Sequence, residues 1–364
     1  MKSTRVGPAL CALALLGSLQ AMEQAKQPAS GFTHRVETDS KTGWKIVELT
    51  HQPGGSSEPL AARIVPSAGS NLYSLKLGET ELLVQPPELS ALPGNRYGFP
   101  ILYPTPNRVR DGKFTFDGVP YSFPPNNRGN FIHGFVHSIP WQMNEPTSDR
   151  NGARLDTWLD WNSSQPNFRL FPIEHRLHVN YSMTKGGVRI EFAVENREDR
   201  RLPFGFALHP WFRILGERAQ TYLKVPARKH MEAVDLLPTG KLVDLEGSSL
   251  DLRKPVSLES LKLDDVYWGL TPDRVPGYEA RDHGIAVTLG ASREFTHMVV
   301  YTPAGRPYFC MENQTCSTDA HNLAARGLKK ESHLLVASKG KPVKGWVMVG
   351  VKKSEPRPKS EPRP

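Results

Sequence analysis

Residues 205–214 place one imidazole, which could move a proton, among apolar and aromatic side chains. The segment reads GFALHPWFRI, with His209 directly before Pro210. A residue before proline is pushed toward extended backbone, so this histidine should lie in strand-like structure. Imidazole has an ordinary pKa of about 6.5 and can accept or release a proton near neutral pH. The alternative is a core histidine whose hydrogen bonds are satisfied.

A single carboxylate further along the chain could act as the matching base. Glu312 follows the apolar run PYFCM and opens the polar stretch NQTCSTD. Partial burial at the end of a strand can raise the pKa of a carboxyl group into the range useful for a general base. The more common fate of a lone glutamate is an exposed position in a loop.

Other polar residues could hold the hydroxyl groups of a ligand. Asn107 and Arg108 precede a predicted hairpin, and His133 follows it. The planar guanidinium of arginine suits hydroxyl or carboxylate oxygens, although a surface ion pair would also explain Arg108. A hydrogen bond to the backbone would explain His133 equally well. Asp264 and Asp265 stand among aromatic residues in LDDVYWGL, where they could accept hydroxyl hydrogen bonds or cap a turn.

The elements that must position these residues are strands. Alternating or β-branched and aromatic patterns mark nine segments, namely 44–50, 71–83, 113–123, 153–161, 175–184, 188–198, 284–290, 297–303 and 345–352. Asp117-Gly118 and the segment 185–187 are hairpin-turn signals. Thirty glycines and 32 prolines argue against long helices, and AHNLAARG is among the few helix-like pieces. The pattern predicts an all-β fold, a large antiparallel sandwich or barrel.

The two ends differ from the body. Residues 1–21 combine Lys2 and Arg5 with a short apolar run, which predicts a signal peptide and a periplasmic or secreted protein. An uncleaved N-terminal anchor is the alternative. We expect a flexible lead-in at 22–40, one domain at 41–351, and a disordered tail at 352–364, where the proline-rich, charged motif SEPRP repeats.

Charge and cysteine usage limit the classes of partner and site. Much of the formal net charge of +9 lies in the two ends, and no basic stripe with interleaved aromatics indicates nucleic-acid binding. Cys310 and Cys316 could pair in an exported protein or remain free, buried thiols. No cysteine or histidine spacing typical of zinc is present, so no metal is expected.

Taken in chain order, these motifs resemble those of the aldose 1-epimerase (galactose mutarotase) family. The similar segments are NRVRDGKF, FIHGFVHSIPW, LHPWF, LPTGKLVDLEGSSLDLRKP, LDDVYWGL and MENQTCSTDAHN, spread over most of the chain from about residue 40 to about residue 350. Phe135 replaces a usual glycine, and Asn313 and Thr318 replace usual prolines. HGFVH is also similar to the HGFAR of hexose-phosphate mutarotases, with His137 in place of the arginine. These departures leave the preferred sugar open.

The resemblance implies a galactose mutarotase-like supersandwich that interconverts the α and β anomers of free aldoses by acid–base ring opening and closure. Glu312 would be the base that takes the anomeric proton. Protonated His209 would be the acid that serves the ring oxygen from the opposite side of the sugar. Substrate hydroxyls would be held by the remaining candidates, Asn107, Arg108, His133 and Asp264, with Asp264 chosen over Asp265 by its place in the motif.

No cofactor is implied, and the expected partner is a monosaccharide, with no nucleic acid and no membrane after signal cleavage. A monomer or a homodimer is expected. Two other functions remain open. One is an exported carbohydrate-binding protein without catalysis. The other is a hydrolase or lyase that uses Asp264 and Glu312 as paired carboxylates.

Overall fold

The computed structural model describes Met1, residues 31–353 and Glu355. The predicted signal peptide after Met1 and most of the predicted tail lie outside the described residues. Within the described part of the chain, no helix is long and apolar enough to cross a membrane.

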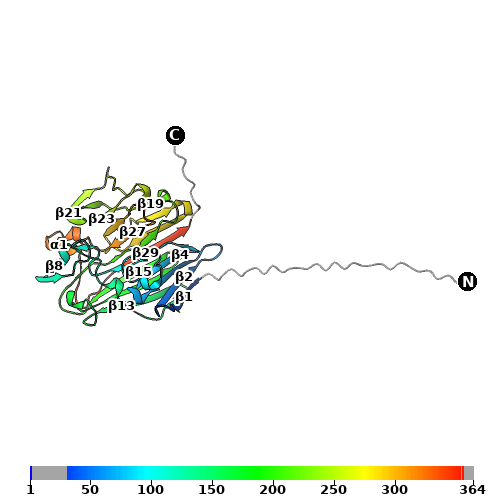
Figure 1. Ribbon diagram of the computed structural model, residues 1–364, viewed down its shortest axis with the longest axis horizontal. Helices are drawn as coiled ribbons and strands as arrows, with labels where there is room; N and C mark the ends of the chain where they lie inside the picture. Colours follow the sequence, from blue (N-terminus) through cyan, green and yellow to red (C-terminus); the bar gives the residue numbers. More distant parts are fainter. Residues whose placement is uncertain (2–30, 354, 356–364) are drawn as a thin grey trace.

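The fold is an antiparallel β-sandwich, as the strand patterns predict (Figure 1). The larger sheet has ten strands: β11 (Gln142–Met143), β12 (Thr147–Asp149), β13 (Gly152–Trp161), β14 (His175–Thr184), β15 (Gly187–Asn196), β29 (Val343–Lys353), β25 (Ile285–Ala291), β24 (Gly277–Ala280), β19 (Thr221–Lys224) and β22 (Val256–Ser257). The second sheet has eight strands: β21 (Leu237–Asp244), β20 (Lys229–Val234), β23 (Asp264–Trp268), β26 (His297–Tyr301), β27 (Tyr308–Gln314), β17 (Ala207–Leu208), β18 (Trp211–Arg213) and β6 (Ile101–Leu102).

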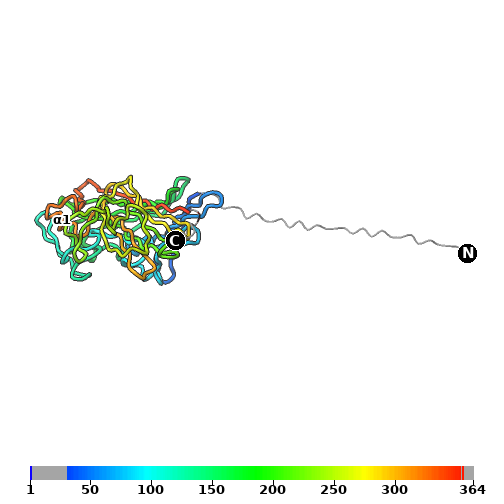
Figure 2. The backbone as a smooth tube through the Cα atoms, turned by 90° about the horizontal axis from the view of Figure 1, so that it is seen from above, coloured from blue at the N-terminus to red at the C-terminus, as the bar shows by residue number. Residues whose placement is uncertain are grey.

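Smaller sheets complete the strand structure. One has five strands: β1 (Gly31–Thr38), β2 (Lys45–Gln52), β3 (Leu60–Val65), β4 (Asn71–Leu77) and β5 (Thr80–Glu81). The two-stranded pairs are β7 (Arg108–Val109) with β10 (Phe131–Ile132), β8 (Lys113–Phe116) with β9 (Val119–Ser122), and β16 (Leu202–Phe204) with β28 (Leu335–Ala337). The helices α1 (Ala320–Ala325) and α2 (Lys329–Ser332) are short, as expected. Figure 2 shows α1 at one end of the body, away from the blue strands β1 and β2.

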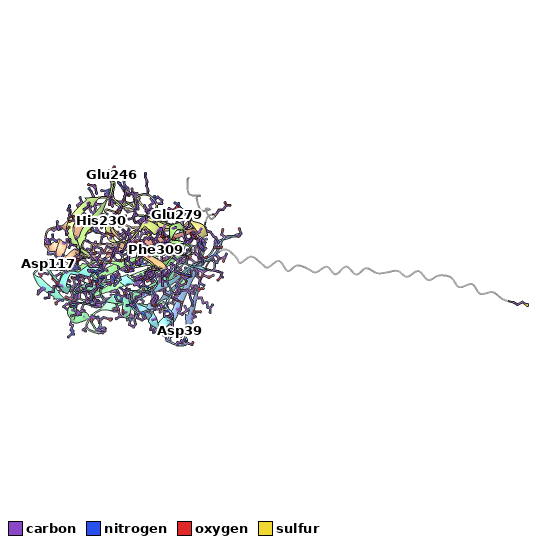
Figure 3. The ribbon with its side chains drawn as sticks, turned by 45° about the horizontal axis from the view of Figure 1, so that its top comes forward. Asp39, Asp117, His230, Glu246, Glu279 and Phe309 are labelled. Atoms are coloured by element: carbon purple, nitrogen blue, oxygen red, sulfur yellow. The ribbon has the colours of Figure 1, made fainter. Side chains whose placement is uncertain are left out.

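Aromatic side chains join the two large sheets. Phe192 of β15 stacks on Phe206, which precedes β17, with ring centroids 4.4 Å apart. Tyr278 of β24 packs against Phe212 of β18 and Phe309 of β27, each at 4.9 Å. All five are buried, and burying an aromatic side chain of this size contributes about 1.5–3 kcal/mol. Figure 3 shows Phe309 near the middle of the body.

The hairpin signals are confirmed. Asp117 and Gly118 have positive φ of 50° and 75° and join β8 to β9, whose tip lies at the edge of the molecule in Figure 3. Positive φ at both central residues is what a tight two-residue hairpin turn requires. Thr184 pairs with Gly187, so Lys185 and Gly186 form the turn between β14 and β15.

The domain boundaries need a correction. Strand β1 lies within the predicted flexible lead-in and pairs with β2 along its whole length. Phe32 is its one buried residue, and its ring lies 4.6 Å from that of His51. Because most of β1 is exposed, its sequence lacks the apolar alternation that marks a half-buried strand. At the other end, β29 continues to Lys353, two residues beyond the predicted boundary.

Candidate active site

Strand pairing brings His209 and Glu312 together. β17 and β18 both pair with β27, with Ala207 opposite Gln314 and Trp211 opposite Cys310. The residue midway, His209, therefore stands opposite Glu312. Its Nε2 atom lies 3.2 Å from Glu312 Oε1, and both side chains are nearly fully buried.

This arrangement corrects one expectation. We expected the imidazole and the carboxylate on opposite sides of a sugar, but they lie side by side. Cross-strand neighbours on one face of a sheet have Cβ atoms about 4.5–5.5 Å apart, which leaves their side chains in direct reach. The sequence separation of the two residues carries no information about this register.

Alternation along β27 separates the core from the site. Phe309 and Met311 belong to the hydrophobic core, whereas Glu312 lines a cavity. Gln314 lies on the same strand face as Glu312 and donates a hydrogen bond from Nε2 to Glu312 Oε2 at 3.0 Å. Gln314 was not predicted as a site residue. The spacing of two in MENQ is the signal that could have identified it.

The cavity has a volume of about 350 Å³ and collects all six predicted site residues. Ligand sites commonly have volumes of about 300–1,000 Å³, which places this cavity at the size of a small ligand. The predicted residues that line it are Asn107, Arg108, His133, His209, Asp264 and Glu312. Trp211, one of the aromatic residues next to His209 in the sequence, also lines it. The remaining lining residues, which the sequence did not single out, are Asn95, Asn127, Arg128, Ile132, Leu236, Val299 and Tyr301.

Flat rings fix the position of His209. Its imidazole stacks on Trp211, with centroids 5.0 Å apart and an interplanar angle of 14°, and meets His133 edge-on at 5.2 Å. Trp211 is held in turn by a hydrogen bond from Nε1 to the Asn95 carbonyl at 2.6 Å. The imidazole therefore has one defined orientation beside an apolar surface.

Side-chain contacts fix Arg108. The guanidinium donates to Asn107 Oδ1 at 3.1 Å and to Asn127 Oδ1 at 3.2 Å, and it lies 3.6 Å from Asp264 Oδ2. Asp264 opens β23 and pairs with Tyr301, so both contribute to the same rim. The neighbouring Asp265 instead contacts His230 at 2.8 Å and does not line the cavity.

Backbone geometry explains the glycine after His133. Gly134 has φ +72°, and a Cβ atom there would lie 2.0 Å from the Tyr103 carbonyl oxygen. His133 also has positive φ, 73°, and its N–H donates to the Asn107 carbonyl at 3.0 Å. The following residue, Phe135, packs in the core against Trp161 rather than toward the cavity.

Burial favours the uncharged forms of the two central groups. Desolvation raises the pKa of Glu312 well above its usual range, and the negative charge of Asp264 adds to this rise. Desolvation lowers the pKa of His209 to about 4 and that of His133 well below its ordinary value. In the free site these shifts favour a protonated carboxyl group beside a neutral imidazole, a pair that carries no net charge.

Cys310 and Cys316 are both free and buried. Burial raises the pKa of both thiols, which keeps them protonated. Of the two outcomes left open by the sequence, the structure shows free thiols.

Comparison with known proteins shows which family the chain belongs to. The sequence model of the family described as aldose 1-epimerase matches residues 60–343. The chain belongs to the aldose 1-epimerase family. Galactose mutarotase from Rattus norvegicus is 23% identical over 205 residues, 55% of each chain, and that from Homo sapiens is 26% identical over 164 residues, 42% of this chain and 44% of the human one. The match thus spans about half the length of these curated relatives.

Solved structures share the fold of this aldose 1-epimerase family member. A galactose mutarotase-like protein from Clostridium acetobutylicum superposes with a TM-score of 0.78 at 20% identity, covering 89% of this chain and 99% of that chain. Galactose 1-epimerase from Lactobacillus acidophilus NCFM superposes with a TM-score of 0.70 at 15% identity, covering 90% and 100%. At these identities the likeness establishes the supersandwich fold.

Proposed function

We propose that this protein is an aldose 1-epimerase that interconverts the α and β anomers of an aldose, with Glu312 and His209 as the proton-transferring groups. The observation that carries the proposal is their 3.2 Å contact at the wall of a sugar-sized cavity. The anomeric hydroxyl oxygen and the ring oxygen of a pyranose are bonded to the same carbon. Two groups that lie side by side can therefore reach both oxygens from one face.

The proton movements balance within this pair. When the sugar is bound, the shared proton lies on His209. The anomeric hydroxyl then donates a hydrogen bond to Glu312, and this bond stabilises the charged carboxylate. Glu312 takes the proton of the anomeric hydroxyl while His209 gives its proton to the ring oxygen, and the bond between C1 and the ring oxygen breaks. After rotation about C1–C2, both transfers run in reverse and the ring closes on the other face of C1.

The remaining predicted residues would bind the sugar. Arg108 and His133 can donate hydrogen bonds to hydroxyls, while Asp264 and the Asn107 side chain can accept them. The Trp211 ring, which lines the cavity beside His209, offers a flat apolar surface to the C–H face of a pyranose. These residues would fix the pose in which C1 lies against the Glu312–His209 pair.

Polarimetry of freshly dissolved α-sugar tests the proposal. Glu312→Gln and His209→Asn should each lower kcat by roughly 10²- to 10⁴-fold, the contribution of a positioned acid or base. Glu246→Gln, an exposed carboxylate that does not line the cavity, is the matched control and should retain the wild-type rate. Circular dichroism would establish that each variant is folded. A near-normal rate in a folded Glu312 or His209 variant would reject the assignment.

Two further assays, of sugar binding and of reducing-sugar release, separate the two other functions. A carbohydrate-binding protein would bind sugar without accelerating mutarotation. A hydrolase would release reducing sugar from a glycan. Export through residues 1–21 stays a prediction, and mass spectrometry of the mature N-terminus would test it.

A further inference from the structure

Two arginines line the same cavity but differ in their partners. Arg108 contacts Asn107, Asn127 and Asp264, so its charge is compensated. Arg128 lines the cavity from an exposed position, and no ion pair joins it to a carboxylate of the described residues. One cationic group at the cavity is therefore available to a ligand.

The backbone presents Arg128 at a position that arginine rarely occupies. Asn127 and Asn130 exchange two backbone hydrogen bonds, at 2.9 and 2.8 Å, around a two-residue turn. Its central residues, Arg128 and Gly129, have φ of 47° and 82°. Such turns favour Asn, Asp or Gly at the first central position, so arginine there costs stability. Strained positions of this kind cluster at ligand clamps.

The same turn is anchored to the rest of the site. Asn127 Oδ1 accepts the hydrogen bond from Arg108 Nε, which ties the turn to the Arg108–Asp264 pair. The anchored turn therefore holds the backbone of Arg128 at the rim of the cavity that Glu312 and His209 also line.

When the charges of the cavity residues are paired, the positive charge of Arg128 remains without an opposite charge of its own. Glu312 and His209 share one proton and are neutral together, and Arg108 faces Asp264. Burial raises the pKa of Asp264, and the opposite charges of Arg108 and Arg128 counter that rise. The positive charge of Arg128 thus acts on a group inside the cavity, although no ion pair joins Arg128 to a carboxylate of the described residues.

We infer that the preferred substrate is an aldose with an anionic group, and that Arg128 is a specificity-determining residue that pairs with this group. A guanidinium binds carboxylate, sulfonate or phosphate oxygens through paired N–H donors. With this group at Arg128 on the exposed rim, C1 of the sugar would lie at the buried Glu312–His209 pair. The inference rests on the proposed epimerase function and adds to it that the substrate carries a negative charge.

Three sugars with the same ring test the inference: glucose, glucuronate and glucose 6-phosphate. NMR exchange measurements give kcat/KM for the anomerisation of each by the full-length protein. We expect wild type to favour at least one anionic sugar over glucose. Arg128→Gln should lower the ratio of anionic to neutral kcat/KM roughly three- to tenfold, the range for a charge-assisted contact that remains exposed to water. The glucuronate and phosphate arms identify which anion is used.

Arg154→Gln is the matched control, since Arg154 is an exposed arginine on β13 outside the cavity. It removes the same charge and should leave the ratio unchanged. Equal turnover of neutral and anionic sugars, with no change of the ratio in Arg128→Gln, would overturn the inference while the epimerase proposal stands.

Calorimetry separates the two proposals if the protein accelerates the anomerisation of none of the three sugars over the spontaneous rate in water. In that case the epimerase proposal fails, and binding of the same three sugars still tests Arg128. Tighter binding of an anionic sugar that is lost in Arg128→Gln supports the inference. Equal binding of all three overturns it.

Discussion

The hairpin of β14 and β15 has regular backbone geometry, whereas the rim of the cavity has irregular geometry. β14 and β15 pair over ten consecutive positions, and their buried and less buried residues alternate along the strands. The rim is built from two-residue strands and turns, with non-glycine residues at positive φ that include Asn107, Arg128 and His133. Regular periodicity therefore builds the scaffold, whereas the site depends on local geometry that costs stability and is held by surrounding contacts.

Two glycine substitutions, one beside the site and one in the β14–β15 turn, give the largest expected difference between the two regions. Gly134→Ala places a Cβ atom 2.0 Å from a backbone oxygen at positive φ, so the backbone itself must move. We expect about 4 kcal/mol of destabilisation, the exceptional end for a single substitution, together with loss of activity. Gly186→Ala, in the β14–β15 turn, meets only the Thr184 hydroxyl at 3.7 Å and should cost less than about 1 kcal/mol. Urea denaturation measures both, and equal costs would contradict the contrast.

A substitution in the core of the scaffold should lower stability and leave activity unchanged, whereas a site variant should lower activity. Leu177 of β14 is fully buried, so Leu177→Ala should lower the free energy of unfolding by about 3 kcal/mol. Because Leu177 does not line the cavity, kcat at 25 °C should stay near wild type in the folded fraction. A tenfold fall in kcat without unfolding would show that site and scaffold are not separable.

Acid should destabilise the protein partly through the site. The pKa of His209 is about 4 in the folded protein and near the ordinary 6.5 when unfolded, so the unfolded chain binds more protons between these values. Stability should therefore fall as pH drops from about 6.5 toward 4, and His209 alone should account for up to about 2 kcal/mol at pH 5. Denaturation midpoints from pH 7 to pH 5 should fall less steeply in His209→Asn. An unchanged slope would show that His209 is not buried in its neutral form.

The smallest expected effect concerns sugar binding. Asp264→Asn keeps the shape of the side chain but removes the charge that faces Arg108 and that, in the proposed function, would accept hydrogen bonds from sugar hydroxyls. We expect KM to rise about tenfold, the scale of one charge-assisted hydrogen bond, with a smaller change in kcat. Asp265→Asn, next in sequence but outside the cavity, is the matched control. Equal effects of the two variants would remove Asp264 from the binding site.

The same contrast explains how much the sequence could predict. Strand β14 coincides with the predicted segment 175–184, because its alternation directly reflects one buried face. All six predicted site residues line one cavity. The side-by-side placement of His209 and Glu312 could not be predicted, because it depends on the register of β17 and β18 against β27. Arg128 was missed because a lone arginine in a polar loop carries no periodic signal.

The alternation along β27 has an evolutionary consequence. A shift of this strand by one residue would turn Glu312 toward the core and put Met311 or Asn313 in its place at the cavity, so insertions or deletions within it would disturb the core and the cavity together. The turn that carries Arg128 lies outside that strand, so a change of its side chain leaves the register of β27 unaltered. Substitutions at the rim can thus change which ligand the cavity accepts while the strand that carries Glu312 stays intact.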